Sequence, residues 1–228
     1  MSFNKVEPYG IIFVDKKTKM TSHDVVNLIR KKLKIKKVGH TGTLDPIASG
    51  LLIILVGKTT STQQQFQKMN KLYEGKIKLG IETDTWDIDG KIIKKTTPEI
   101  NKHALNSAIS LLNGNIIQQV PPYSAVKYKG QTLYKLARKN KVVPSINRMV
   151  NVNWLDYKLS IDELYFKIKC SSGTYIRSIA HQIGILLGCG ATLIELRRLK
   201  IGEYSIDDAV SIDSINKMDY NSLLKHLK

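Results

Sequence analysis

The chain has 228 residues, of which 42% are hydrophobic and 24% are charged. A chain of this length can bury a core without disulfides or metals, and its two cysteines, Cys170 and Cys189, are too few for a disulfide framework. The longest apolar stretch, Leu51 to Val56, is far shorter than the ~20 residues that span a bilayer. The N-terminal residues lack the apolar region of a signal peptide. We therefore expect a cytoplasmic globular protein with no membrane association.

The net charge of +17 comes from 36 basic and 19 acidic residues. Thirty of the basic residues are lysines, so part of the excess reflects composition. The charge is nevertheless clustered, because residues 100–155 hold 8 basic and no acidic residues, whereas residues 197–228 hold 6 and 5. Clustering is typical of a surface that binds a polyanion. Since no amphipathic anchor or lipidation motif accompanies the charge, nucleic acid is a better candidate than a membrane.

Hydrophobic periodicity predicts alternating strands and helices along the chain. Strands are predicted at residues 10–15, 51–56, 73–79, 116–120, 148–159, 164–171 and 193–200. Helices are predicted from Ser22 as N-cap, from Thr97-Pro98 to residue 112, at residues 131–139 and 174–187, and near Leu223. This mixture predicts one α+β domain whose helices pack on a mostly antiparallel sheet.

Several familiar motifs are incomplete. Gly57-Lys58-Thr59 resembles the end of a phosphate-binding P-loop, but Leu52 stands where that motif needs a glycine. Asp87-x-Asp89-Gly90 resembles part of a calcium loop, but no glutamate closes it. The histidines and cysteines lack zinc-ligand spacing, and neither the dinucleotide nor the serine-hydrolase motif is present. The sequence therefore predicts no metal and no cofactor.

The segment from Gly39 to Gly50 is rich in glycine and carries Asp45-Pro46. Its three glycines allow the backbone to approach a ligand closely or to adopt positive φ. Pro46 biases Asp45 away from the α region, which holds the carboxylate on an extended loop. Taken alone, an Asp-Pro pair of this kind more often forms a turn than a catalytic site.

The longer string Val38-Gly39-His40-Thr41-Gly42-Thr43-Leu44-Asp45-Pro46 resembles the catalytic motif of the TruB family, the bacterial tRNA pseudouridine-55 synthases. Further motifs follow in family order: Asp15-Lys16, Lys71-Leu72-Tyr73, Gly80-x-x-Thr83-Asp84-Thr85, Pro121-Pro122-Tyr123-Ser124-Ala125-Val126-Lys127, Gly130-x-x-Leu133-Tyr134-x-x-Ala137-Arg138, Ser172-Gly173-Thr174-Tyr175-Ile176-Arg177 and Leu196-Arg197-Arg198-Leu199. The resemblance covers about residues 8–204. It implies the pseudouridine synthase fold, with a mixed, mostly antiparallel central sheet flanked by helices.

The resemblance also implies a reaction, the isomerisation of uridine to pseudouridine at position 55 in the T-loop of tRNA. No atoms or electrons are gained overall, which agrees with the absence of a cofactor motif. The uridine must be flipped out of the folded loop, at a cost of a few kcal/mol. Three routes stay open for the carboxylate: attack at C1′, addition at C6, and deprotonation at C2′.

The family's functional residues match six positions of this sequence. Asp45 matches the catalytic aspartate, Arg177 the arginine that pairs with it, and Tyr73 the tyrosine that stacks on the uracil and removes the late proton. The matched substrate-binding residues are His40, which supports the T-loop, Tyr73, Tyr175, and Leu196 along the uracil edge. Separately, the basic character of Lys16 makes it a candidate substrate-binding residue that contacts RNA phosphates. Without the resemblance, core packing is the simpler interpretation of both tyrosines.

We expect residues 1–209 to form the catalytic domain and residues 210–228 a short C-terminal tail, without the PUA domain that many family members carry. We also expect a monomer with no protein partner, and unusually salt-sensitive RNA binding. Two alternatives stay open. One is a non-catalytic protein that binds or folds tRNA, and the other is a pseudouridine synthase that acts on another RNA.

Overall fold

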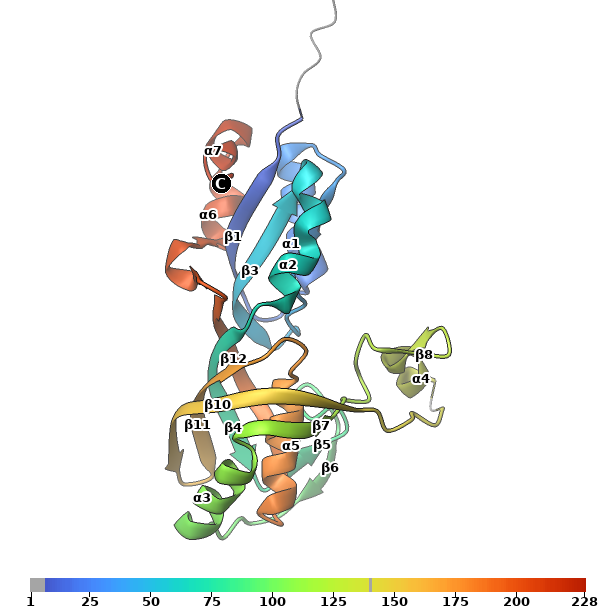
Figure 1. Cartoon of the computed structure of the whole chain (residues 1–228), viewed down its shortest axis with the longest axis vertical. Coiled ribbons are helices and arrows are strands. Elements are labelled where there is room, and N and C mark those ends of the chain that lie inside the picture. The colour runs from blue at the N-terminus through green and yellow to red at the C-terminus, as the bar shows by residue number, and fades with distance from the viewer. Residues whose placement is uncertain (1–6, 140) are drawn as a thin grey trace, which may run out of the picture. The chain divides into compact units, whose positions relative to one another are not determined.

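The computed structural model describes residues 7–139 and 141–228 (Figure 1). Their contacts divide the chain into two compact units. The first unit combines residues up to Tyr73 with Arg197–Lys228, and the second unit is Glu74–Leu196.

The first unit contains a small sheet and several helices. Its strands are β1 (Gly10–Lys16), β2 (Val38–His40), β3 (Ala48–Val56), β13 (Tyr204–Ser205) and β14 (Val210–Ser211). Its helices are α1 (Ser22–Leu33), η1 (Gly57–Thr62), α2 (Gln63–Lys68), η2 (Ile206–Asp208), α6 (Ile212–Lys217) and α7 (Tyr220–Leu224). β1 and β3 pair antiparallel from Gly10 opposite Val56 to Lys16 opposite Gly50. Both strands are almost fully buried, because apolar side chains cover both of their faces.

The second unit contains longer strands. These are β5 (Ile81–Thr83), β6 (Ile92–Lys95), β7 (Gly114–Gln119), β8 (Lys127–Tyr128), β9 (Gln131–Thr132), β10 (Asn147–Ser160) and β11 (Glu163–Cys170). Its helices are α3 (Lys102–Leu111), α4 (Leu133–Arg138) and α5 (Ile176–Leu186). Along β11, buried residues alternate with half-buried or exposed ones, as in a strand with one covered face. Ser178 and Gln182 of α5 donate hydrogen bonds to carbonyls of β7, which satisfies part of the edge of that strand.

Two strands carry the chain from one unit to the other, β4 (Lys71–Leu79) and β12 (Ala191–Ile201). Strand pairing gives a ten-stranded sheet with the order β14-β1-β3-β12-β4-β11-β10-β7, to which β2 and β13 add through β3 and β12. The pairing of β1 with β14 is parallel, whereas those of β1 with β3, β10 with β11, and β10 with β7 are antiparallel. The predicted α+β class and mixed, mostly antiparallel sheet are therefore confirmed.

Two predicted helix starts are wrong. The N-cap of α1 is Thr21 rather than Ser22, because Thr21 and Asp24 form a capping box. The helix expected from Thr97-Pro98 begins only at Lys102, with Asn101 as its N-cap. The preceding residue Thr96 is held elsewhere, since its backbone N–H donates to Gly80 and its hydroxyl to Cys189.

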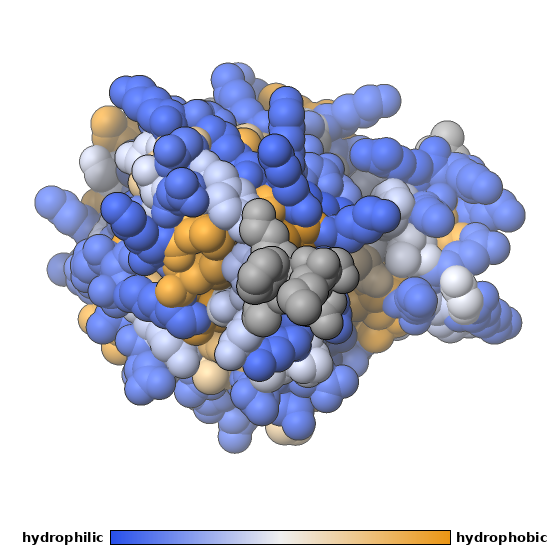
Figure 2. Space-filling view, turned by 90° about the horizontal axis from the view of Figure 1, so that it is seen from above, coloured by the Kyte–Doolittle hydropathy of each residue, from blue (hydrophilic) through white to orange (hydrophobic). Residues whose placement is uncertain are grey.

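On the face of the molecule seen in Figure 2, hydrophilic residues surround small separate apolar areas. No helix within residues 7–139 and 141–228 is both long and apolar enough to cross a membrane.

Candidate active site

Asp45 lies in the first unit, on the loop that joins β2 to β3. The buried Ser22 hydroxyl holds this loop from α1, because it accepts a hydrogen bond from the Leu44 N–H at 2.8 Å and donates to the Leu44 carbonyl at 3.2 Å. The Asp45 carbonyl accepts from Ala48 N–H at 3.0 Å, and the side chain is half-buried. The carboxylate therefore stands on a loop whose backbone is fixed on both sides.

The side chain of Arg198 also fixes the loop that carries Asp45. Its side chain is almost completely buried, and its guanidinium donates from Nε to the Leu51 carbonyl at 2.8 Å and from Nη2 to the Gly42 carbonyl at 3.1 Å. Gly50 allows this close packing, because its φ is 104° and a Cβ there would overlap the Arg198 carbonyl oxygen. The Leu196-Arg197-Arg198 motif thus supports the Asp45 loop through the buried arginine.

A Gly50→Ala variant should lose about 3 kcal/mol or more of unfolding free energy, because strain at positive φ and steric overlap add. Gly130→Ala is the matched control, since Gly130 also has positive φ but a Cβ added there would meet nothing within 4 Å. The control should lose only about 1–2 kcal/mol. Urea unfolding of both variants measures the difference, and equal losses would contradict this packing role for Gly50.

Lys16 is fully buried in the first unit, and its ammonium donates to the carbonyls of Lys17 at 2.8 Å and Met20 at 2.7 Å. Burial lowers the pKa of Lys16 to about 8, while the Asp45 carboxylate acts in the opposite direction. This position corrects the expectation that Lys16 faces RNA phosphates. A buried cation of this kind instead contributes electrostatic support near Asp45.

His40 and Tyr73 also belong to the first unit. His40 ends β2 and is half-buried, and its carbonyl accepts from Gln63 Nε2 at 2.9 Å. Burial, and next the charge of Arg198, lower the pKa of His40, which favours a neutral imidazole at neutral pH. Tyr73 is 8% exposed on β4. Two residues earlier, the Lys71 ammonium donates to carbonyls at the end of α2 and so anchors the start of this strand.

In the second unit, Arg177 occupies the first turn of α5 and is 5% exposed. Its Nε lies 3.5 Å from Asp87 Oδ2. Its Nη1 donates to the Thr85 carbonyl at 3.0 Å and its Nη2 to the Tyr123 carbonyl at 3.1 Å. These contacts fix the plane of the guanidinium.

Asp87, like Ser22 and Arg198, is a supporting residue of the site whose role the sequence does not predict. Its Oδ1 accepts from the Thr85 hydroxyl at 2.7 Å and from the Asp89 N–H at 3.2 Å, so the carboxylate also organises its own loop. In the sequence, Asp87 and Asp89 form an acidic pair whose spacing resembles only an incomplete calcium loop. A buried aspartate that pairs with an arginine 90 residues away has no local spacing signal.

Tyr175 and Leu196 complete the predicted residues of the second unit. Tyr175 is the N-cap residue of α5, where the Gln118 side chain accepts from its N–H at 2.7 Å and donates to its carbonyl at 3.0 Å. Leu196 is buried on β12. The first unit therefore carries Lys16, His40, Asp45 and Tyr73, and the second carries Tyr175, Arg177 and Leu196. The predicted pairing of Arg177 with Asp45 joins the two sets and stays a prediction.

Two family models match the chain in succession. Residues 30–176 match the N-terminal domain of the TruB family of pseudouridylate synthases, and residues 177–227 match the C-terminal domain of tRNA pseudouridylate synthase B. The chain belongs to the TruB family.

Curated relatives agree with this TruB assignment. The chain is 43% identical to tRNA pseudouridine synthase B of Clostridium tetani, over 91% of this chain and 73% of that protein. It is 40% identical to the protein of the same name from Opitutus terrae, over 96% of this chain and 91% of that protein.

Solved structures resemble the TruB chain in fold. A chain of a Cbf5-Nop10-Gar1 complex superposes with a TM-score of 0.71 at 26% identity, over 96% of this chain and 59% of that one. A chain of an H/ACA RNP bound to a substrate RNA containing 2′-deoxyuridine gives a TM-score of 0.66 at 26% identity, over 90% of this chain and 51% of that one. These likenesses confirm the predicted pseudouridine synthase fold, in a chain that spans little more than half of each solved relative.

Proposed function

We propose that this TruB-family chain isomerises a uridine of tRNA to pseudouridine, at position 55 of the T-loop. The observation that carries the proposal is the Asp45 loop, which Ser22 and Arg198 fix within a chain matched by both TruB family models. The relatives, which are tRNA pseudouridine synthases B, support tRNA as the substrate class and pseudouridine formation as the reaction.

The reaction breaks the N1–C1′ bond of uridine and forms a C5–C1′ bond. C5 loses a proton and N1 gains one, so the product has the same atoms as the substrate. Asp45 supplies the carboxylate, and attack at C1′, addition at C6 and deprotonation at C2′ are the routes open to it. The guanidinium of Arg177, held by Asp87, would orient that carboxylate.

Binding energy has to offset the cost of flipping the uridine, a few kcal/mol. Stacking of a base on an aromatic ring contributes about 1–3 kcal/mol, and Tyr73 is the ring we assign to the uracil. Leu196 and Tyr175 would line the base, and His40 would support the emptied T-loop. We assign the phosphate contacts to the basic cluster of residues 100–155, in a chain whose net charge is +17.

Tyr73→Phe separates binding from turnover. The phenylalanine ring keeps the stacking surface but lacks the hydroxyl that would remove the C5 proton. We expect tRNA affinity within about threefold of wild type and a kcat lower by about 10²–10⁴-fold, the usual contribution of a general base. Filter binding and single-turnover kinetics measure the two quantities. A loss of affinity with unchanged kcat would contradict the proposed role of the hydroxyl.

Release of tritium from tRNA that carries [5-³H]uridine tests the function itself, because isomerisation removes the hydrogen at C5. We expect release without added metal or nucleotide. Tight tRNA binding without tritium release would instead support the alternative of a non-catalytic RNA-binding protein. Release from ribosomal RNA but not from tRNA would support a different RNA substrate.

The same proposal includes a monomer that acts in the cytoplasm, where unmodified tRNA is available. The large charge of one sign disfavours self-association.

A further inference from the structure

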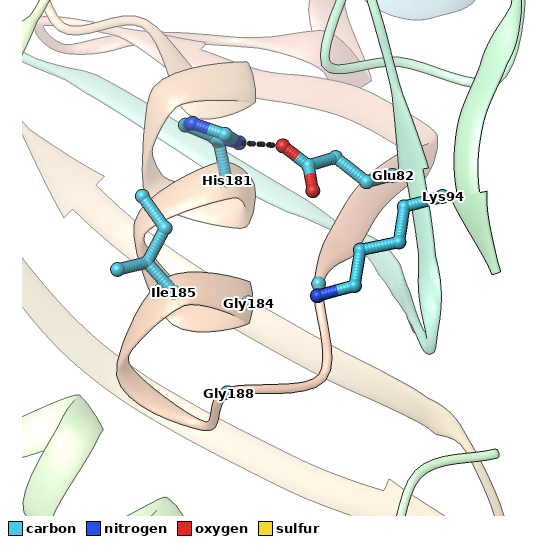
Figure 3. Close-up of a pocket in the computed structure, with 7 residues that line it drawn as sticks. Glu82, Lys94, His181, Gly184, Ile185 and Gly188 are labelled. Carbon is cyan, nitrogen blue, oxygen red and sulfur yellow. Dashed lines mark ion pairs between the residues drawn. The ribbon is translucent and has the colours of Figure 1, made fainter. Parts of the chain in front are cut away.

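The second unit contains a cavity of about 210 Å³ between the β5–β6 hairpin and the C-terminal half of α5 (Figure 3). Its lining residues are Glu82, Lys94, His181, Gly184, Ile185, Gly188 and Gly190. This volume is below the range of about 300–1,000 Å³ that holds drug-sized ligands, so it suits a single small ring system.

Two opposite charges face this cavity without neutralising each other. Glu82 and Lys94 are direct cross-strand partners of β5 and β6, yet no ion pair joins them in this described part of the chain. Figure 3 shows the Glu82 carboxylate directed toward His181, whereas the Lys94 side chain extends toward the end of α5. A hydrogen-bond acceptor and a hydrogen-bond donor therefore border the same space separately.

His181 does not neutralise Glu82 either. Its Nδ1 lies 3.7 Å from Glu82 Oε1, beyond hydrogen-bond distance. Burial lowers the pKa of His181, and this outweighs the opposing effect of Glu82, so the imidazole is neutral at neutral pH. The Glu82 carboxylate keeps its acceptor capacity for a ligand.

Two residues of α5 that line the cavity, His181 and Gly184, are closely packed against their neighbours. The His181 ring stacks on Trp86, with ring centroids 4.3 Å apart and an angle of 8° between the planes. On the same helix, Gly184 packs so closely on β12 that a Cβ would overlap the backbone nitrogen of Ala191. This α5 wall therefore loses little conformational entropy when the cavity binds a ligand.

We propose that this cavity binds the base of a guanine nucleotide. Guanine presents two adjacent donors, N1–H and N2–H, which match the two oxygens of a carboxylate, and its O6 and N7 accept from lysine. Glu82 would take the first edge and Lys94 the second, while Ile185 contacts the ring face. Adenine offers a carboxylate one donor beside the N1 acceptor, and cytosine and uracil lack the lysine-binding O6/N7 pair.

The residues that line the proposed cavity differ from those of the candidate active site. Along α5, the lining residues His181 and Ile185 follow Arg177 by four and eight residues, which corresponds to about 6 Å and about 12 Å at the rise of an α-helix. The guanine could come from a free nucleotide or from an unpaired guanosine of RNA, and only the second source rests on the proposed function. Lys91, three residues before Lys94, is exposed and is the candidate contact for a phosphate in either case.

Isothermal titration of the full chain with GMP, AMP, CMP and UMP tests base recognition. We expect GMP to bind at least tenfold more tightly than the other three. Glu82→Gln should weaken GMP binding at least tenfold, because the amide nitrogen would face the donors of guanine, and Lys94→Met should weaken it several-fold. The matched control is Glu203→Gln, an exposed glutamate of the first unit, which should leave GMP binding unchanged.

A second arm separates the two sources of guanine. If RNA is the source, the single-stranded hexamer UUGUUU should bind more tightly than UUAUUU, and Glu82→Gln should abolish the difference. If GMP alone is selected, the site is one for free nucleotide. The same titrations on Asp45→Asn do not require turnover, so they give a result even if the proposed function fails. Equal binding of all four nucleotides, absence of GMP binding, or binding unaffected by Glu82→Gln would overturn the proposal.

Discussion

Replacing Asp45 with asparagine should reduce pseudouridine formation by on the order of 10⁴-fold or more, the scale on which enzymes lose activity without their reacting side chain. The asparagine amide has nearly the same shape as the carboxylate, but at neutral pH it acts neither as a nucleophile nor as a base. The fold should survive, because Ser22 and Arg198 hold the loop through its backbone rather than through the Asp45 side chain. Single-turnover assays with saturating enzyme measure the loss.

Asp213→Asn is the matched control for this change. Asp213 lies on α6 in the same unit, in an exposed ion pair with Lys17. The control should keep activity within about twofold of wild type, since exposed ion pairs contribute little. If Asp45→Asn were as active as Asp213→Asn, the assignment of the catalytic carboxylate would be wrong.

Arg177→Met should lower both stability and activity. The ion pair with Asp87 is buried, with side-chain exposures of 6% for Arg177 and 8% for Asp87. Removing one partner of such a pair costs about 3–5 kcal/mol. If Arg177 also orients Asp45, turnover should fall by about 10²–10³-fold, the usual loss when a positioned charge is removed from an active site. Urea unfolding and single-turnover kinetics measure the two effects.

A double-mutant cycle distinguishes these effects. Asp87→Asn in the Arg177→Met background should recover part of the lost stability, because the buried charge is then gone, but it should not recover turnover. Lys217→Met is the control, since this exposed lysine of α6 lies outside the basic cluster of residues 100–155 and outside the family motifs. Full activity in a folded Arg177→Met variant would contradict a positioning role for the arginine.

The sequence predicted the long elements of the fold well, because their hydrophobic periodicity is strong. β1, β10, β11 and β12 were all placed to within a few residues. Helix starts were less predictable, since they depend on which polar side chain reaches the free N–H groups. Thr21 and Asn101 do so here, although Ser22 and Thr97 looked equally suitable. The division of the chain into two units falls within β4 and within β12. The sequence does not predict it, because no change of composition marks either boundary.

The candidate site could be predicted only where a motif carries it. The Asp45 loop and Arg177 were found through the resemblance of their surrounding residues to a family. The residues that hold the Asp45 loop and Arg177 in place could not be predicted in this way. Ser22, Asp87 and Arg198 act through contacts with residues far away in the sequence. The expectation that Lys16 is exposed to RNA phosphates is wrong for a physical reason. Lysines are almost always exposed, and nothing local indicated that two backbone carbonyls hold its ammonium in the core.

Site-resolved pseudouridine mapping tests the proposed function most directly. Two unmodified tRNA transcripts would be incubated with the wild-type chain, one with the T-loop uridine at position 55 and one with cytidine there. We predict a single pseudouridine at position 55 in the first transcript and none in the second. Pseudouridine at other positions in both transcripts, or none in either, would contradict the function proposed for this chain.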